Sequence, residues 1–275
     1  MDCFYINLAN ATDRRDRLER NFASVSHAAW ALNRFEAVDV AQVQQRAVAG
    51  ILRDSEKACF LSHKAVVAKA AGLQATLLVA EDDVQFGHQT FAAIDDFLAL
   101  SAQNQLPWDI VFTDICVPLA ENMVQLIRLR QQLEPGKRKQ MIDLNNIIFG
   151  GATAYLVNGA SAQKVHALLE GCERLDVAYD IQLRRLIHEG KLKAYCLFPF
   201  LTTLSADAEA SQIQASSTQM TDLIWNTFRR MVWQERQLDQ VDGDIQKIRQ
   251  LCLDDESEKF GLILGALLSK AFVPK

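Results

Sequence analysis

The feature that most constrains the fold is an apolar run of strand length that ends in three adjacent carboxylates. Residues 77–80 are all apolar, and Glu81, Asp82 and Asp83 follow directly. Adjacent carboxylates repel each other, so a folded chain keeps them together mainly where a cation or substrate compensates their charge. Hard divalent ions prefer oxygen ligands and can hold a diphosphate. The sequence therefore indicates either a divalent-ion site at the end of a buried strand or a solvated acidic turn.

The composition excludes some classes of protein. The chain has 275 residues, enough for one large or two small domains, and a formal net charge of -5. This charge lacks the basic excess of nucleic-acid-binding proteins, so we expect no nucleic-acid partner. The six cysteines form no Cys-x-x-Cys pair and several lie in apolar runs, which is typical of reduced, buried thiols rather than of disulfides or a zinc site. The first residues do not resemble a signal peptide, and no apolar segment is long enough to span a bilayer, so we expect a cytoplasmic protein.

Strand-length apolar runs alternate with segments of helical periodicity along most of the chain. Strands are expected at 3–8, 34–38, 75–80, 109–112, 147–149, 152–157 and 193–198. Helices are expected at 13–24, from Asp54 or Ser55 to Ala71, and at 88–100, 119–133, 159–169 and 178–188. This alternation predicts an α/β fold with a mostly parallel sheet. Ligands of such sheets bind beyond the carboxyl ends of the strands, where the acidic triplet and Asp114 fall.

The last quarter of the chain has a different character. Residues 206–219 are rich in Ala, Ser and Gln and indicate a linker, and 221–238 form a strongly amphipathic helix. Further helices are expected at 244–252 and 258–271, and these C-terminal helices are candidates for an oligomer interface. An apolar helical face packs in a core or lies in a membrane interface, and for 221–238 both alternatives stay open.

Four ordered stretches resemble one known family. They are Tyr5-Ile6-Asn7-Leu8 with Asp13-Arg14-Arg15, then residues 34–39, then Cys59-Phe60-Leu61-Ser62-His63, and finally the strand that ends in the triplet. In this order and spacing the chain resembles glycosyltransferase family 25, the bacterial lipooligosaccharide galactosyltransferases and their collagen-modifying relatives. Residues 108–112, 150–164, 175–177 and 211–213 extend the resemblance over roughly residues 3–214.

The resemblance implies a GT-A fold, Rossmann-like with a mostly parallel sheet, for residues 1–214, followed by a helical extension at 215–275. It implies an inverting transferase that uses a divalent metal, Mn²⁺ first and Mg²⁺ second. The donor would be a UDP-sugar, with UDP-galactose as the leading choice, and the acceptor a saccharide of a surface glycolipid in lipopolysaccharide biosynthesis. Such an acceptor would place the protein in the cytoplasm, with peripheral contact to the inner face of the inner membrane through 221–238.

The resemblance also implies roles for the acidic residues. Asp83 would be the direct metal ligand, and Glu81 and Asp82 would support the ion, the ribose or the donor sugar, with Glu81 as a second ligand. Inversion needs a further carboxylate as general base. Asp176 matches the family's Pro-x-Asp element, although Arg174 replaces the proline. Asp180, one helical turn later, is the alternative, and a helix-capping role for Asp176 stays open.

Donor-binding residues are expected along the same motifs. Arg14, Arg15 and Arg34 are candidates for phosphate or base contacts, because the planar guanidinium donates hydrogen bonds in pairs. Asn7 is a candidate for the uracil or ribose. The remaining donor-side candidates are Leu8, Ala37, Asp39, Ser62, His63, Gly150 and Tyr155. A solvated helix face for the arginines, a structural histidine and an ordinary glycine turn are the alternatives.

A second class of function stays open at this point. Ala58 stands where the family commonly has glycine, and Arg174 departs from its proline. A degenerate member could keep the fold and bind a nucleotide or partner without transferring sugar. A nucleotide-sugar synthesising enzyme is disfavoured, because no Gly-rich phosphate loop lies near the N-terminus.

Overall fold

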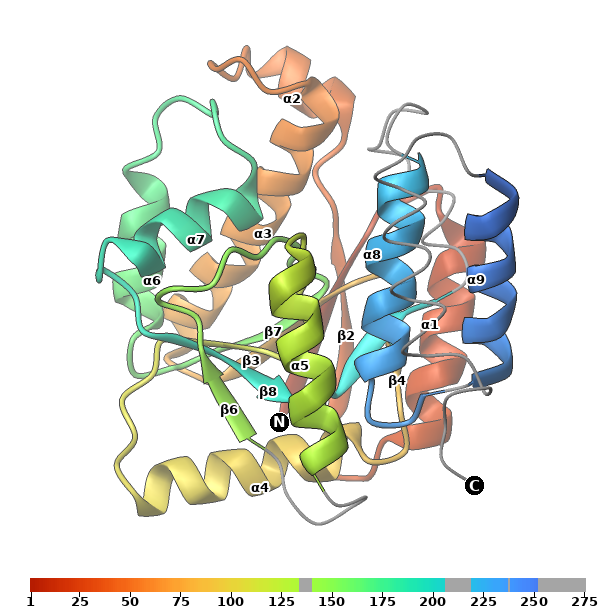
Figure 1. Ribbon diagram of the computed structural model, residues 1–275. Helices are drawn as coiled ribbons and strands as arrows, with labels where there is room; N and C mark the ends of the chain where they lie inside the picture. Colours follow the sequence, from red (N-terminus) through yellow and green to blue (C-terminus); the bar gives the residue numbers. More distant parts are fainter. Residues whose placement is uncertain (134–139, 206–218, 237, 252–275) are drawn as a thin grey trace.

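A computed structural model describes residues 1–133, 140–205, 219–236 and 238–251 (Figure 1). Within these residues, seven strands form the central sheet. Their spatial order is β2 (Ala31–Glu36), β1 (Asp2–Asn7), β3 (Leu77–Glu81), β7 (Ala154–Val157), β5 (Ile110–Phe112), β8 (Ala194–Phe198) and β6 (Gln140–Asp143). Strands β2, β1, β3, β5 and β8 run in one direction, and β7 and β6 run against them. The predicted α/β fold with a mostly parallel sheet is confirmed.

Helices cover both faces of this sheet, because alternate side chains of each strand point to opposite faces. On β3, Leu77 and Val79 join one apolar cluster, whereas Leu78 and Ala80 join the other. The first face packs against α3 (Asp54–Leu73), α5 (Ala120–Gln132), α6 (Ala162–Glu170) and α7 (Tyr179–His188). The second packs against α1 (Thr12–Val25) and α4 (Thr90–Gln103). A short helix, α2 (Val40–Gln45), precedes α3. The result is three layers, helix–sheet–helix.

A two-stranded ribbon holds the segment that follows the acidic triplet. It pairs β4 (Val84–Phe86) antiparallel with β9 (Thr202–Leu204). The backbone N–H of Ser205 donates to the carbonyl oxygen of Asp83 at 2.8 Å, directly beyond this pairing. The triplet is therefore fixed on one side by the central sheet and on the other by the ribbon.

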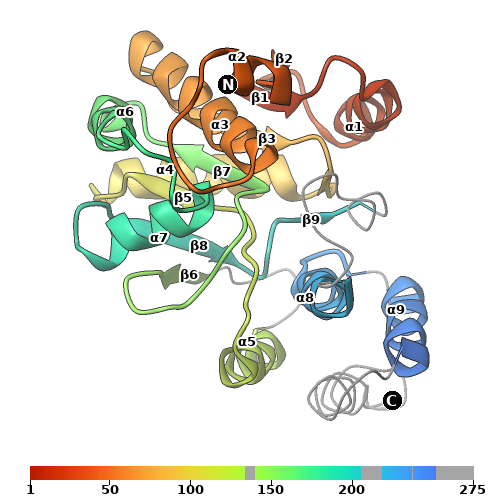
Figure 2. The ribbon, with the colours of Figure 1, turned by 90° about the horizontal axis from the view of Figure 1, so that it is seen from above.

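The C-terminal helices are α8 (Gln219–Val232) and α9 (Leu238–Leu251), and α8 lies between α5 and α9 (Figure 2). The apolar face of α8 belongs to the same buried cluster as the sheet; its members are Leu223, Ile224, Phe228, Met231 and Val232. The structure thus shows the packing alternative for this face. The division at residue 214 stays a prediction, although α8 shares the core of the preceding domain. Across the described residues, every helix is too short or too polar to cross a membrane.

Some expected elements differ in the structure. Residues 147–149 form no strand: Phe149 is buried, but the following Gly150 pairs only in an isolated bridge with Cys116. The amphipathic helix ends at Val232 instead of 238, because Trp233 bridges to Phe200. The short elements α2, β4, β6 and β9 were not expected from apolar periodicity. Of the linker expected at 206–219, residues 206–218 lie outside the described residues, and Gln219 begins α8. The helix expected at 258–271 also lies outside the described residues.

Candidate active site

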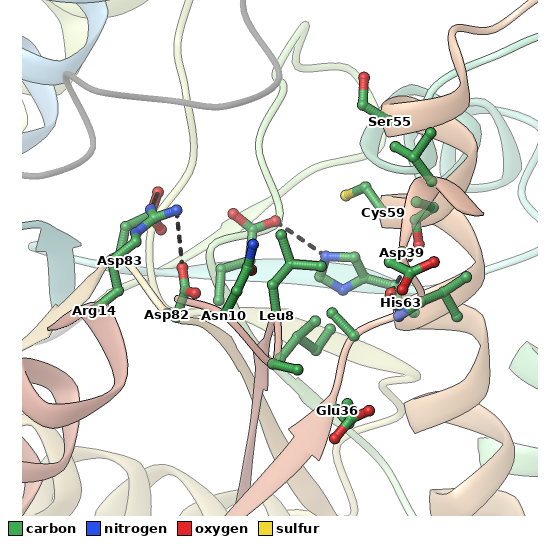
Figure 3. A pocket seen from close by; sticks show the side chains of 18 residues that line it. Leu8, Asn10, Arg14, Glu36, Asp39, Ser55, Cys59, His63, Asp82 and Asp83 are labelled. Carbon is green, nitrogen blue, oxygen red and sulfur yellow. Dashed lines mark hydrogen bonds and ion pairs between the residues drawn. The ribbon is translucent and has the colours of Figure 1, made fainter. Parts of the chain in front are cut away.

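The carboxyl ends of β1, β2 and β3 meet at one edge of the sheet. Ile6 lies opposite Glu81, and Asn7 lies opposite Glu36. A cavity of about 570 Å³ opens at this edge, between the triplet and α3 (Figure 3). Its polar lining includes Asn10, Arg14, Glu36, Asp39, Ser55, Cys59, Ser62, His63, Glu81, Asp82 and Asp83. The structure therefore places the triplet at a cavity rather than on a solvated turn.

Arg14 pairs with two members of the triplet. Its Nη1 lies 3.2 Å from Asp82 Oδ1, and its Nη2 lies 2.9 Å from Asp83 Oδ2. Asn7 supports Asp82 from the sheet, since its Nδ2 donates to Asp82 Oδ2 at 2.8 Å. Arg34 in turn donates from Nε to Asn7 Oδ1 at 3.1 Å. Asn7 and Arg34 therefore orient Asp82 from behind.

Asp83 has the strongest electrostatic perturbation of the triplet. Burial, followed by the charge of Glu81, raises the pKa of Asp83 from 3.8 to about 7, although Arg14 opposes the shift. Among the described residues, Asp83 Oδ1 is buried and has no hydrogen-bond partner. A buried carboxylate oxygen that lacks a partner beside two further carboxylates fits a divalent cation.

A chain of polar groups runs from Glu81 into the core through His63. The His63 Nε2 lies 3.0 Å from Glu81 Oε1, and its Nδ1 lies 3.0 Å from the Tyr155 hydroxyl. The Tyr155 hydroxyl is 2.8 Å from that of Tyr179, whose ring stacks on the imidazole at 4.5 Å. Burial opposes ionisation of Glu81, but the hydrogen bond and charge of His63, with Arg229 and Arg14, outweigh it and lower the pKa of Glu81.

Cys59 lies one helical turn before His63 on α3, and both line the cavity (Figure 3). One ligand atom each from Cys59, His63 and Glu81 all lie within 4.8 Å of one another. Burial raises the pKa of the Cys59 thiol, and the charges of Glu81, Asp180 and Asp83 raise it further. With Glu56 as the fourth, four carboxylates thus act on this sulfur.

A second cavity of about 310 Å³ adjoins the first and shares Cys59, His63, Glu81 and Asp83 with it. Its other polar side chains are Arg53, Glu56, Thr153, Tyr179, Asp180, Asn226 and Arg229. Asp180 Oδ2 accepts a hydrogen bond from the backbone N–H of Gly151 at 2.6 Å. Gly151 has φ of +79°, so this turn suits glycine. The second cavity therefore holds a carboxylate, Asp180, across from the triplet.

Arg229 comes from α8 and was not among the residues expected at the site. Its Nε donates to Asp114 Oδ2 at 2.8 Å, and its Nη2 donates to Thr153 Oγ1 at 2.7 Å. Arg229 and Asp114 are both buried. Arg229 lies outside the apolar face of the amphipathic helix, so the sequence pattern alone gives no sign that it is buried against Asp114.

The structure separates the expected donor-side residues into two groups. Those that line the first cavity are Leu8, Arg14, Ala37, Asp39, Ser62, His63, Glu81, Asp82 and Asp83. The described lining of both cavities leaves out Asn7, Arg15, Arg34, Gly150 and Tyr155. Of these, Asn7, Arg34 and Tyr155 contact lining residues. Arg15 Nε lies 3.6 Å from its neighbour Asp16, and the Gly150 N–H donates to Cys116 O at 3.0 Å.

Asp176 lies apart from the described lining of both cavities. Its Oδ1 accepts from the Ile51 N–H at 2.8 Å, its Oδ2 lies 3.3 Å from Arg174 Nε, and its side chain is 40% exposed. The hydrogen bond from the Ile51 N–H is the largest of the causes that lower the pKa of Asp176. Asp176 thus fastens the loop before α3, whereas Asp180 faces the second cavity.

The fold and site define an α/β protein with an acidic, cation-compatible ligand cavity at the carboxyl edge of its sheet. The chain belongs to glycosyltransferase family 25: the family model, described as glycosyltransferase family 25 (LPS biosynthesis protein), matches residues 1–182. The protein is therefore a glycosyltransferase. Among solved structures it is similar to the crystal structure of mouse xyloside xylosyltransferase 1 in its apo form, with 10% identity, a TM-score of 0.38 and 70% of each chain covered. Among curated proteins no match was found.

Proposed function

We propose that the protein is a metal-dependent, inverting glycosyltransferase of GT-A type. It would transfer a sugar, galactose first among the candidates, from a UDP-sugar to a saccharide of a surface glycolipid. One observation carries the proposal: in a family 25 chain, three carboxylates at the end of a central strand line a cavity with a buried, unpartnered oxygen on Asp83. The metal, the UDP-sugar and the stereochemistry are proposals that this observation supports.

The first cavity is the proposed donor site. Its volume of about 570 Å³ lies within the range of small-molecule sites, roughly 300–1,000 Å³. Asp83 and Glu81 would hold the cation, which supplies positive charge to offset the negative charge that builds up on the leaving diphosphate. Arg14 would move from the carboxylates to the diphosphate once a cation compensates them, since its planar fork suits phosphate oxygens.

The second cavity is the proposed acceptor site, with Asp180 as general base. Asp180 faces this cavity, and the cavity shares Glu81 and Asp83 with the donor side. A base must reach the acceptor hydroxyl within hydrogen-bond distance, and geometry comes before pKa in that choice. Asp180 fulfils this condition better than Asp176, which is bonded to the Ile51 N–H away from the cavity lining in the described residues.

Any contact with the inner membrane would need a surface other than the apolar face of α8, because that face is buried. We keep peripheral membrane contact and a glycolipid acceptor as part of the proposal, on the strength of the family's description alone.

Thermal unfolding with UDP and Mn²⁺, together and separately, tests the donor site. A ligand at 100 times its Kd stabilises the folded state by about 2.7 kcal/mol, which raises the melting temperature. We expect UDP with Mn²⁺ to raise it in the native protein and to have little effect on Asp83→Ala, and UDP-galactose to be hydrolysed or transferred only by the native protein. Equal responses of the two proteins would contradict the metal role of Asp83.

One observation favours a second candidate function. Arg14 already pairs with Asp82 and Asp83, and so competes with a metal for the same oxygens. A protein in which this pairing persists would bind a nucleotide without transferring sugar. UDP binding that is independent of Mn²⁺, with no hydrolysis of any UDP-sugar, would identify this case.

A further inference from the structure

We propose that Cys59, His63 and Glu81 form a binding site for a soft divalent cation of the Zn²⁺ class, at the wall between the two cavities. These residues supply a thiol sulfur, an imidazole nitrogen and a carboxylate oxygen, all within 4.8 Å of one another. The site shares Glu81 with the proposed hard-ion site, whose other ligand is Asp83, but its sulfur and nitrogen ligands are its own, and it does not depend on sugar transfer.

The helix sets two of the three ligands. Cys59 and His63 are four residues apart on α3, so their side chains project from the same face on successive turns (Figure 3). Glu81 ends β3 and faces this helix, with its Oε1 3.0 Å from the His63 Nε2. Two rigid elements therefore hold the ligand set.

The contacts of His63 prepare it to bind a metal. A metal-bound histidine usually donates its other ring N–H to a fixed acceptor, which sets the tautomer and the orientation of the ring. The Tyr155 hydroxyl lies 3.0 Å from His63 Nδ1, and it is itself 2.8 Å from the Tyr179 hydroxyl. The Nε2 nitrogen faces Glu81 and is hydrogen-bonded to it in the metal-free protein; a cation would replace that bond, and Nδ1 would then carry the proton and donate it to the Tyr155 hydroxyl.

Charge and access also favour a cation here. Besides Glu81, the carboxylates of Asp83 and Asp180 act on the Cys59 sulfur. Both cavities reach all three ligands, so a fourth coordination position opens to solvent or to a bound molecule. Such a site, with three protein ligands and one open position, resembles the coordination of catalytic rather than structural zinc.

The kind of donor selects the kind of ion. Thiolate and imidazole suit Zn²⁺ and Co²⁺, whereas Mg²⁺ and Mn²⁺ prefer oxygen. Ligands of a tetrahedral zinc ion lie roughly 3.5 Å apart, given bonds of about 2.0–2.3 Å. The His63 Nε2 and Glu81 Oε1 already lie 3.0 Å apart, so the approach that is still needed, roughly 1 Å at most, concerns the Cys59 sulfur. Rotation of the Glu81 side chain, 32% exposed, can adjust the position of its oxygen. On binding, a sulfur–metal bond forms and the Cys59 thiol loses its proton to solvent.

Cobalt spectroscopy on the full chain tests the proposal. Co²⁺ bound to a thiolate gives a near-ultraviolet charge-transfer band that Co²⁺ bound only to oxygen lacks, so the hard-ion site cannot mimic it. We expect one equivalent of Co²⁺ to produce this band in the metal-free protein under reducing, anaerobic conditions, and Zn²⁺ to abolish it by displacement. Cys59→Ser should lose the band, and Cys172→Ser, which changes a partly buried cysteine outside both cavity linings, should keep it.

One further variant, Tyr155→Phe, and an X-ray absorption measurement on the native protein complete the test. Tyr155→Phe should keep the band but weaken Co²⁺ binding about 10-fold or more, as loss of a partner behind a metal ligand usually does. X-ray absorption of the Zn²⁺-loaded native protein should show one sulfur at about 2.3 Å. A shell of only nitrogen and oxygen, or a thiolate band that survives Cys59→Ser, would overturn the proposal. Loss of Mn²⁺-dependent UDP binding alone would leave it standing and count against the proposed function instead.

Discussion

Arg229 on α8 forms an ion pair with Asp114 at the end of β5, across 115 positions of the sequence, and both side chains are buried. The same guanidinium donates to Thr153 and lines the second cavity. Residues 1–182 match the family, so this arginine lies beyond the matched segment. Helix α8 thus completes a wall of the candidate site.

We expect Arg229→Ala to destabilise the protein strongly. Removing one partner of a buried ion pair leaves the other charge uncompensated, at a cost of about 3–5 kcal/mol. The matched control is Arg174→Ala, which removes an exposed pairing with Asp176 and should leave the unfolding midpoint nearly unchanged. Denaturant unfolding of both variants measures the difference. Similar midpoints for the two would show that the Asp114 pair contributes little.

Asp83 should make stability depend on pH. Its pKa is about 7 in the folded protein and near 3.8 when exposed, so the folded state binds the proton more tightly. The stabilisation by the protonated form is complete below about pH 4 and is lost as the pH rises through about 7. In the Asp83→Asn variant the side chain is neutral at every pH, so this stabilisation is not lost as the pH rises.

Without metal, Asp83→Asn should therefore be more stable than the native protein, and its advantage should be about 2–3 kcal/mol larger at pH 8 than at pH 5. Urea unfolding in chelator at the two pH values measures this. An advantage that does not grow with pH would show that Asp83 ionises normally. Added Mn²⁺ should reverse the order, since only the native carboxylate binds it well.

The two candidate bases should separate in kinetics. We expect Asp180→Asn to lower kcat by about 10²–10⁴-fold, the usual contribution of a positioned general base. Asp176→Asn keeps an oxygen that can accept the Ile51 N–H, so kcat should change little. Initial rates at saturating UDP-sugar measure both variants. A large loss in Asp176→Asn with a normal Asp180→Asn would reverse the assignment.

Gly50 should tolerate no side chain. It has φ of +127°, and a Cβ atom there would lie 2.2 Å from the carbonyl oxygen of Leu175. We expect Gly50→Ala to lower the melting temperature and to loosen the loop that Asp176 fastens. Gly72 is the matched control: it lies in α3 with nothing within 4 Å of its Cβ position, so Gly72→Ala should stabilise the protein by about 0.5–1 kcal/mol. Equal effects of the two substitutions would contradict this account of Gly50.

Much of the fold could be predicted because the spacing of apolar residues and the ends of strands can be recognised within short stretches of the sequence. Residues 77–80 and 110–112 are continuous apolar runs, and both belong to strands that are buried on both faces. The antiparallel insertion of β7 between β3 and β5 depends on contacts far apart in sequence, which periodicity does not record. The pairing of the short strands β4 and β9 could not be predicted for the same reason, because the two strands are far apart in the sequence.

The candidate site divides in a similar way. Glu81, Asp82 and Asp83 follow directly from a strand end, and the structure places all three in the cavity. The sequence also argued against a zinc site, because no cysteines are closely spaced. Cys59 joins His63 and Glu81 only when α3 packs beside β3. The sequence did not predict Arg229 at the site, because a buried arginine needs a partner of opposite charge, and that partner, Asp114, lies in a distant part of the chain.

The wall that the two cavities share has a thermodynamic consequence. Cys59, His63, Glu81 and Asp83 face both sides, so a molecule in one cavity changes the charge and position of groups that contact a molecule in the other. Affinities coupled through common side chains are reciprocal: the factor by which the first ligand changes the binding of the second equals the factor in the opposite direction. The total free energy of forming the doubly bound complex is therefore the same whichever of the two ligands binds first.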